Sequence, residues 1–293
     1  MAGGRRVRVR LAALALCVAV AVPAVARAQG PGRGAGPAAT GRAAALKDLT
    51  GYWVSVVAEH WHLRMLVPPK GNFEMLPLNA EARRVANTWD PAKESEPCKS
   101  YGAAAIMRVP GRLHIQWADD NTLRIDTDSG TQTRLFHFGG APPAVQGAGS
   151  AAQGVGRVLP PSPSASARLA VAQKRGGGSD PPKADWQGYS VAMWERAARG
   201  GGEGRTAGDL KVTTTRMRAG YLRKNGVPYS ENTSLEEYFD MFSEPNGDTW
   251  LVIDSVVRDP QYLTQPYLTS VAFKKLPNAS GWDPTPCRAD QPR

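Results

Sequence analysis

One acidic side chain lies among apolar residues in a segment that has the pattern of a β-strand. Leu235, Phe239 and Met241 share one parity with Glu237, so a strand places all four on the same face. Such a face excludes water, which favours a neutral carboxyl group and suits acid or base catalysis. Glu237 is therefore the candidate catalytic residue. Two alternatives remain, namely a one-residue shift of register that exposes it and a structural ion pair with an arginine.

A second carboxylate, Glu195, follows Trp194 near the end of another predicted strand. If it faced the same cavity as Glu237, the two groups could hold a cation or divide the acid and base roles. The alternative is a solvated strand end.

Four arginines alternate with apolar residues on several predicted segments: Arg64, Arg108, Arg124 and Arg134. Two guanidinium groups turned inward would bind a carboxylate or phosphate in a bidentate manner. We therefore name Arg64, Arg134 and Glu195 as candidate ligand-binding residues. The alternative is that the arginines form the wetted face of the sheet.

His60 and His62 form a His-x-His pair on a predicted strand, which directs both imidazoles to one face. This spacing suits metal ligands when a third ligand is present. The only other histidines are His114 and His137, on separate predicted strands. The alternative is that His60 and His62 are ordinary exposed or hydrogen-bonded histidines.

Aromatic residues recur along the same strands and are candidates for the wall of an apolar ligand pocket. Trp53, Trp117 and Tyr238 are the residues we assign to such a pocket. The alternative is that aromatic side chains merely fill the interior of a small barrel.

These residues depend on short strands with turn residues between them. An antiparallel meander spans residues 230–275, with turns at 245–248 and 259–260. Further strands are expected at residues 49–57, 60–67, 103–109, 112–117, 121–127, 131–138, 188–195 and 209–217. One short helix is expected at 80–86, capped by Asn79. About ten strands predict an all-β fold, an antiparallel up-and-down barrel or strongly curved sheet.

Composition divides the chain into an exported domain with flexible additions. Residues 1–28 have the charged start, apolar core and small-residue cleavage pattern of a signal peptide. Residues 29–46 predict a disordered leader, and 139–185 a disordered low-complexity insertion. The segments 47–138 and 186–290 then form one barrel-like domain. We expect a periplasmic or secreted bacterial protein cleaved after Ala28.

Two cysteines remain after cleavage, Cys98 and Cys287, and in an oxidising compartment such a pair predicts one disulfide. Two buried free thiols are the alternative. The bond would cross the insertion, which favours one domain.

Net charge and missing motifs limit the function classes. The signal carries five arginines and no acid, so its removal takes the net charge from +10 to +5, which does not call for nucleic acid. The sequence contains no glycine-rich phosphate loop and no Gly-x-Ser-x-Gly motif. We expect no cofactor, and no integral membrane segment once the signal is removed.

Several phrases in the second half of the chain resemble an uncharacterised family of exported bacterial proteins. They are Gly188-Tyr189-Ser190, Trp194-Glu195, Gly208-Asp209-Leu210-Lys211-Val212, Asn225-Gly226-Val227-Pro228-Tyr229-Ser230, Glu237-Tyr238-Phe239 and Asp259-Pro260. The family is similar in layout to lipocalin-like antiparallel barrels and has no established activity. The resemblance implies a fold and a compartment, and residues 51–138 share it more weakly.

The sequence favours a barrel that binds a small apolar or amphipathic ligand. Two other functions remain open: an acid–base enzyme (isomerase, lyase or hydrolase) that uses Glu237, and a structural or interaction protein of the cell envelope. A buried carboxylate motivates the enzyme, and flexible flanking segments motivate the interaction protein.

Overall fold

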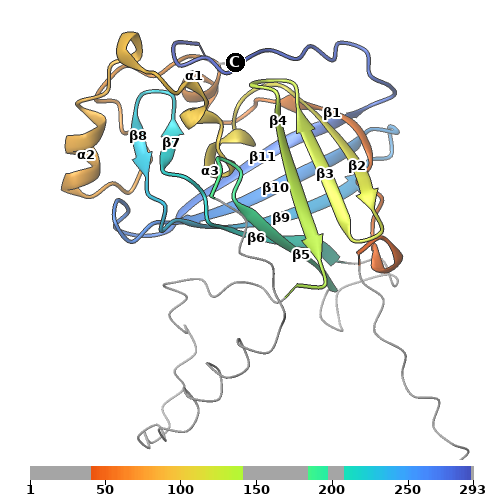
Figure 1. Ribbon diagram of the computed structural model, residues 1–293. Helices are drawn as coiled ribbons and strands as arrows, with labels where there is room; N and C mark the ends of the chain where they lie inside the picture. The colour runs from red at the N-terminus through yellow and green to blue at the C-terminus, as the bar shows by residue number, and fades with distance from the viewer. Residues whose placement is uncertain (1–40, 141–183, 197–207, 292–293) are drawn as a thin grey trace, which may run out of the picture. The chain divides into compact units, whose positions relative to one another are not determined.

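The computed structural model describes residues 41–140, 184–196 and 208–291. Nine of its strands close into a barrel in the order β1-β11-β10-β9-β6-β5-β4-β3-β2 (Figure 1). The predicted β-barrel is therefore confirmed. The predicted signal peptide lies outside the described residues, as does nearly all of the predicted insertion. The last residues of the predicted leader are ordered, because Gly41–Ala44 form a 3-10 helix and Leu46 is buried.

The elements are short and follow the predicted strands closely in most places. The barrel strands are β1 Gly51–Val56, β2 Arg112–Asp119, β3 Thr122–Thr127, β4 Gln132–Phe138, β5 Tyr189–Arg196, β6 Gly208–Thr215, β9 Ser234–Ser243, β10 Thr249–Arg258 and β11 Tyr267–Leu276. A separate hairpin pairs β7 Gly220–Arg223 with β8 Val227–Tyr229. The helices are α1 Trp61–Arg64, α2 Ala80–Ala86 and α3 Ala103–Ile106, with 3-10 helices η1 Gly41–Ala44, η2 Pro91–Lys93 and η3 Pro97–Tyr101.

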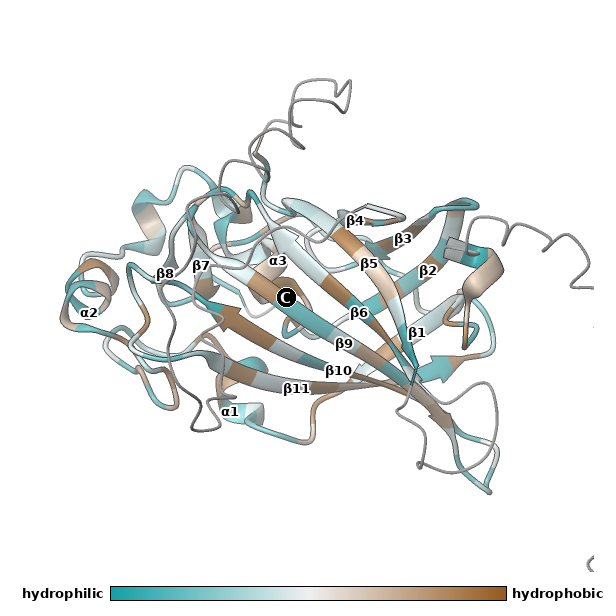
Figure 2. Cartoon of the chain, turned by 90° about the horizontal axis from the view of Figure 1, so that it is seen from below, coloured by the Kyte–Doolittle hydropathy of each residue, from teal (hydrophilic) through white to brown (hydrophobic). Residues whose placement is uncertain are grey.

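The meander of β9, β10 and β11 shows why the barrel forms. Leu235, Glu237 and Phe239 are buried, and the intervening residues are not, because successive side chains on a strand point to opposite faces. Figure 2 shows the resulting alternation of hydrophobic and hydrophilic residues along the strands. The predicted turn at 245–248 connects β9 to β10, whose first pair is Ser243 with Thr249.

One neighbouring pair in the barrel is parallel. Phe136, His137 and Phe138 of β4 pair with Ser190, Val191 and Ala192 of β5 in the same direction. Directions can alternate all the way round a closed ring only when the number of strands is even, so nine strands require at least one parallel pair. The expected antiparallel order holds for the other eight neighbouring pairs.

Two predicted strands are helical. Residues 103–109 contain α3, whose three alanines favour a helix and give no alternation of apolar and polar side chains. Residues 60–67 contain the single turn of α1. His60 is the residue before this turn, and its backbone is in the left-handed conformation with φ 49°. The predicted helix α2 is confirmed at 80–86, and the side chain of Asn79 accepts a hydrogen bond from the backbone N–H of Ala82 at 2.9 Å.

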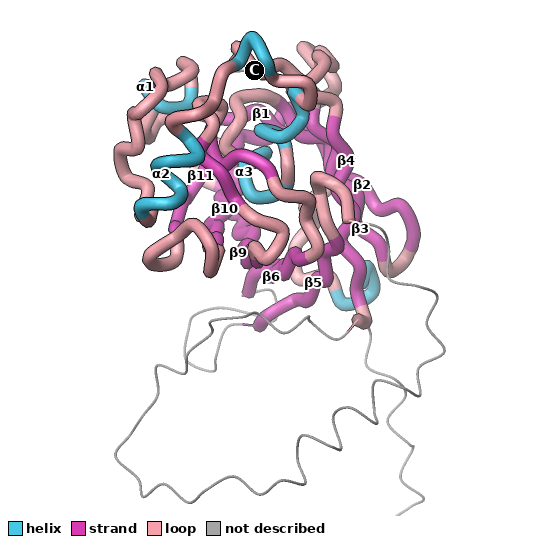
Figure 3. Tube along the Cα trace, turned by 60° about the vertical axis from the view of Figure 1, so that its left-hand side comes forward, coloured by secondary structure: helices cyan, strands magenta, loops and turns pink. Residues whose placement is uncertain are grey.

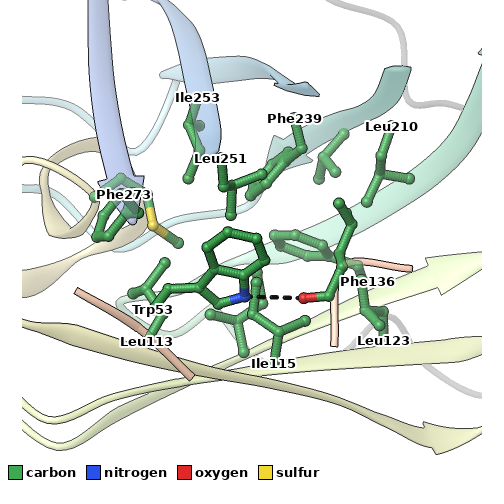
Figure 4. Packing of buried hydrophobic residues seen from close by; sticks show 14 of the residues in the cluster. Trp53, Leu113, Ile115, Leu123, Phe136, Leu210, Phe239, Leu251, Ile253 and Phe273 are labelled. Carbon is green, nitrogen blue, oxygen red and sulfur yellow. Dashed lines mark hydrogen bonds between the residues drawn. The ribbon is translucent and has the colours of Figure 1, made fainter. Parts of the chain in front are cut away.

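Side chains fill the barrel interior. Trp53, Phe136, Phe239 and Phe273 are almost fully buried in one cluster, together with leucine and isoleucine side chains from β2, β3, β6 and β10 (Figure 4). Trp53 Nε1 donates a hydrogen bond to the backbone oxygen of Leu49 at 3.0 Å, which satisfies its one polar atom. The core therefore stabilises the fold by apolar burial without leaving a polar group unpaired at Trp53.

Short helices and loops gather over one end of the barrel (Figure 3). Tyr101, Ile106 and Met107, from η3 and α3, belong to the same core cluster as the strands. The predicted disulfide between Cys98 and Cys287 is present, and it ties η3 to the C-terminal tail. The tail also docks through Arg288, whose backbone N–H donates to the Tyr101 hydroxyl at 3.1 Å.

Candidate functional site

Glu237 lies inside the barrel, on the apolar face that its parity predicts. It is 1% exposed and faces Arg134 of β4, which is completely buried. Arg134 Nη1 donates to Glu237 Oε1 at 2.9 Å, and Nη2 donates to Oε2 at 2.6 Å. Nη2 also lies 3.3 Å from the hydroxyl of Thr214, which is 2.7 Å from that of Ser190. Four strands thus contribute to one polar cluster in an apolar core.

The geometry of this cluster is that of a structural ion pair. Both carboxylate oxygens of Glu237 accept hydrogen bonds from one guanidinium, and this bidentate arrangement is among the strongest side-chain pairings. The guanidinium also lies 4.9 Å from the centre of the Phe136 ring. The catalytic role of Glu237 stays a prediction, and this pairing weighs against it because the carboxylate is already engaged.

Glu195 and Tyr238 lie on the outer face, so of the two alternatives for Glu195 the solvated strand end holds, and Tyr238 is not part of an apolar pocket inside the barrel. Glu195 is exposed, and its carboxylate is 3.6 Å from the ammonium of Lys211. The same ammonium lies 5.2 Å from the centre of the Tyr238 ring. Tyr238 follows Glu237 directly, so strand alternation turns its side chain outward.

His60 and His62 lie at α1 and not on a strand, so the reason for expecting both imidazoles on one face is wrong. His62 Nε2 is 3.4 Å from Glu74 Oε2. Within the described residues, no group of three or more His, Cys, Asp or Glu side chains could hold a metal ion. The metal role of the two histidines has no support in this geometry.

Trp53 and Trp117 both point into the barrel, and Trp117 also lines a hollow of about 310 Å³ beside residues 42–50. Trp53 is fully buried in the core, and half-buried Trp117 packs against Phe138 with ring centres 5.4 Å apart. Of the two alternatives for the aromatic residues, filling the interior describes Trp53, and the ligand role of Trp117 stays a prediction.

A pocket rich in cations lies at the helix-covered end of the barrel. Its volume is about 40 Å³, and α1, α3, β7 and their adjoining loops contribute its lining. The cationic lining residues are Arg64, Arg108, Arg223 and Lys224. Apolar and small residues complete it: Leu63, Leu66, Pro68, Ser100, Ala105, Val109, Pro110 and Leu222. Among the described residues, no aspartate or glutamate lines this pocket.

Arg64, a predicted ligand-binding residue, is buried in this pocket and is partly compensated. Its Nε donates to the backbone oxygen of Arg108 at 3.0 Å, and its Nη1 forms an ion pair with Glu59. Its Nη2 is buried without a hydrogen-bond partner. Burial lowers the pKa of Arg64, and the attraction of Glu59 opposes this shift.

Arg223 has less compensation. It is 5% exposed, and both its Nε and its Nη1 are buried without a hydrogen-bond partner. Burial lowers the pKa of Arg223, the hydroxyl of Tyr267 and the charge of Glu74 oppose this shift, and the positive charge of Arg108 adds to it. A guanidinium in such surroundings favours the approach of an anion.

Lys224 follows Arg223 and is also buried. Its ammonium donates to the Tyr101 hydroxyl and to the backbone oxygen of Gln291, both at 2.6 Å. Burial lowers the pKa of Lys224 to about 7, against a weaker opposing effect of Asp290. The lysine therefore changes its charge near neutral pH, next to the pocket.

A larger hollow of about 370 Å³ lies on the outer face, beside the parallel pair of β4 and β5. Its lining includes His137, Tyr189 and Arg216. The His137 and Tyr189 rings stack with centres 5.1 Å apart, and the Arg216 guanidinium lies 6.0 Å from the Tyr189 ring. These side chains are already paired with one another, so this hollow offers fewer unpaired polar groups than the cationic pocket.

Comparison of the chain with protein-family models, curated proteins and solved structures finds no match. Among the helices of the described residues, none is long and apolar enough to span a membrane. The site must therefore be interpreted from its own geometry.

Proposed function

We propose that the protein is an exported binding module that takes a small amphipathic ligand at the helix-covered end of its barrel. The pocket there carries the proposal, because cationic side chains and apolar side chains line the same cavity. Binding sites usually combine an apolar wall with a few polar groups that fix orientation. The barrel interior, by contrast, is occupied by the packed core.

Export is part of this proposal. The pattern of residues 1–28 supports it, as does the disulfide, since such bonds persist in oxidising compartments. The resemblance to uncharacterised exported bacterial proteins with lipocalin-like barrels supports it as well.

Native mass spectrometry of protein purified from its own host tests this function. We expect a bound small molecule, and we expect Leu66→Ala to weaken its retention about fivefold because part of the apolar wall is lost. Leu268→Ala is the matched control. Both leucines are well exposed, at 57% and 67%, but Leu268 is not part of the pocket lining. Protein without bound ligand, whose melting temperature no amphiphile changes, would contradict the proposal.

An interaction module is the second candidate, and one surface feature favours it. Trp61, Met65, Leu66 and Met75 are each about half exposed and lie on α1 or the loop that follows it. Large apolar side chains gathered in one segment often mark a protein contact. Cross-linking of the exported protein in cells, with Trp61→Ser as the test variant, would recover a specific partner if this function holds.

A further inference from the structure

We infer that the cationic pocket binds an oxyanionic group, such as a phosphate or sulfate, between the guanidinium groups of Arg223 and Arg64. This inference rests on the proposed function and names the head group of its ligand. It is independent of the ion pair inside the barrel.

The first step is the state of Arg223. Nine-tenths of its side chain is shielded from solvent, yet two of its nitrogens have no hydrogen-bond partner. A buried donor without a partner is costly, and so is a buried charge that is compensated only by the Tyr267 hydroxyl and the charge of Glu74. A ligand with acceptor oxygens and negative charge removes both costs together.

The second step is Arg64, which presents one further free donor in the same pocket. Glu59 and the backbone of Arg108 occupy its Nη1 and Nε, so these contacts fix the plane of the guanidinium. Its Nη2 remains without a partner. Held guanidinium groups lose little freedom when they bind, which suits recognition of an oxyanion.

The third step is the charge balance of the pocket. Four basic side chains line it, Glu59 is paired with Arg64, and the charges of Glu74 and Asp290 act on Arg223 and Lys224 from outside the lining. Arg108 lies over the Tyr267 ring at 5.6 Å, and Lys224 is held by Tyr101 and the tail. The pocket therefore retains a positive charge that attracts an anion at close range.

Size limits the ligand to one head group. A single water needs roughly 10–15 Å³, so a cavity of about 40 Å³ has room for a small oxyanion and little more. Leu66 and Pro68 at the lining offer contact to an apolar remainder outside the head group. A free oxyanion and the head of an amphiphile share the chemistry that the two arginines recognise.

Calorimetry and thermal shift with three probes test the inference: inorganic phosphate, hexyl phosphate and hexanol, at constant ionic strength. We expect saturable binding of hexyl phosphate and a rise in melting temperature, and Arg223→Met should weaken binding about tenfold or more, as expected for lost charge-assisted hydrogen bonds. Arg124→Met is the matched control, because Arg124 is exposed and pairs with Asp126 at 2.8 Å.

The two sources of the oxyanion give different results. Binding of phosphate as well as hexyl phosphate indicates that a free oxyanion suffices, and binding of hexyl phosphate alone indicates an amphiphile. Equal binding of hexanol and hexyl phosphate overturns the oxyanion but leaves the proposed function intact. No response to any of the three probes overturns both.

A measurement without ligand separates binding from a structural role. Arg223→Met removes a buried charge that lacks full compensation, so we expect the melting temperature of the free protein to stay the same or rise. A clear fall, with phosphate and hexyl phosphate still bound as tightly as by the original protein, would assign Arg223 to the fold and overturn the inference.

Discussion

Two buried arginines, in different parts of the molecule, have opposite surroundings. Inside the barrel, Arg134 has a carboxylate that takes both of its terminal nitrogens, and its Nε alone lacks a hydrogen-bond partner. At the covered end, Arg223 is almost as buried but leaves two nitrogens without partners. Burial alone therefore does not distinguish a structural cation from a binding one. We propose that a missing carboxylate partner together with more than one free donor marks the binding arginine, because native proteins seldom leave buried polar groups unsatisfied.

Removing the carboxylate from the barrel should produce the largest effect. Glu237→Leu leaves Arg134 charged and unpaired in the core, and we expect the free energy of unfolding to fall by about 3–5 kcal/mol. Urea denaturation measures this. In this variant Arg134 would be a buried arginine without a carboxylate partner, as Arg223 is in the ligand-free pocket, but no anion could reach it.

The double variant Arg134→Met with Glu237→Leu is the control for that experiment. It removes both charges and should recover most of the lost stability. If the single variant were as stable as the original protein, the barrel pair would not differ from the pocket in the way that we describe.

The disulfide offers a somewhat smaller test, directed at the covered end. Replacing Cys98 and Cys287 with serine should lower the free energy of unfolding by about 2–5 kcal/mol, because the unfolded chain regains freedom. Hydrogen exchange should accelerate in η3 and β7 before it does in β9 and β10. Equal acceleration in both regions would mean that the helix-covered end and the barrel unfold as one unit and do not differ in local stability.

Lys224 provides a gradual effect, which is small over any single pH unit and appears in the dependence of stability on pH. Its pKa of about 7 in the folded protein lies below the ordinary 10.5, so the unfolded chain binds more protons between these values. The free energy of unfolding should therefore rise with pH from about 7 to 10.5, by at most about 1.4 kcal/mol per pH unit.

Lys224→Met should remove that increment, and the difference between the two proteins isolates it from other titrating groups. Identical pH profiles for both proteins would show that the ammonium is not desolvated in the fold. Anion binding at the pocket should weaken as the pH rises through about 7, where Lys224 loses its charge in the folded protein.

The barrel follows from the sequence because alternation with period two is a local signal. Leu235, Glu237 and Phe239 share a face whatever the rest of the chain does, and the burial of Glu237 follows from that parity. Its partner did not follow, because Arg134 is 103 residues away and only the closure of the barrel brings the two together. The ion pair was one of the open alternatives, and register alone could not select it.

The pocket escaped prediction for a different reason. It is assembled from three short segments, and two of them, around Arg64 and Arg108, were expected to be strands but contain or adjoin single helical turns. The third contains Arg223 and Lys224 in a small hairpin, where adjacent basic residues normally face water. The strongest sequence signal for this pocket was Arg64, whose alternation with apolar neighbours suggested that its side chain is buried.

The parallel contact between β4 and β5 has a practical consequence for how the chain is divided. Cys98 and Cys287 lie on opposite sides of the connection that joins these strands, and β1 pairs with β11 across the same division. A protease cut between residues 141 and 183 would therefore give two polypeptides that migrate together on a non-reducing gel and separate only after reduction. The protein is therefore suited to reconstitution from two separately expressed fragments. The fragments would pair through β4 with β5 and through β1 with β11, and formation of the Cys98–Cys287 disulfide would report correct assembly.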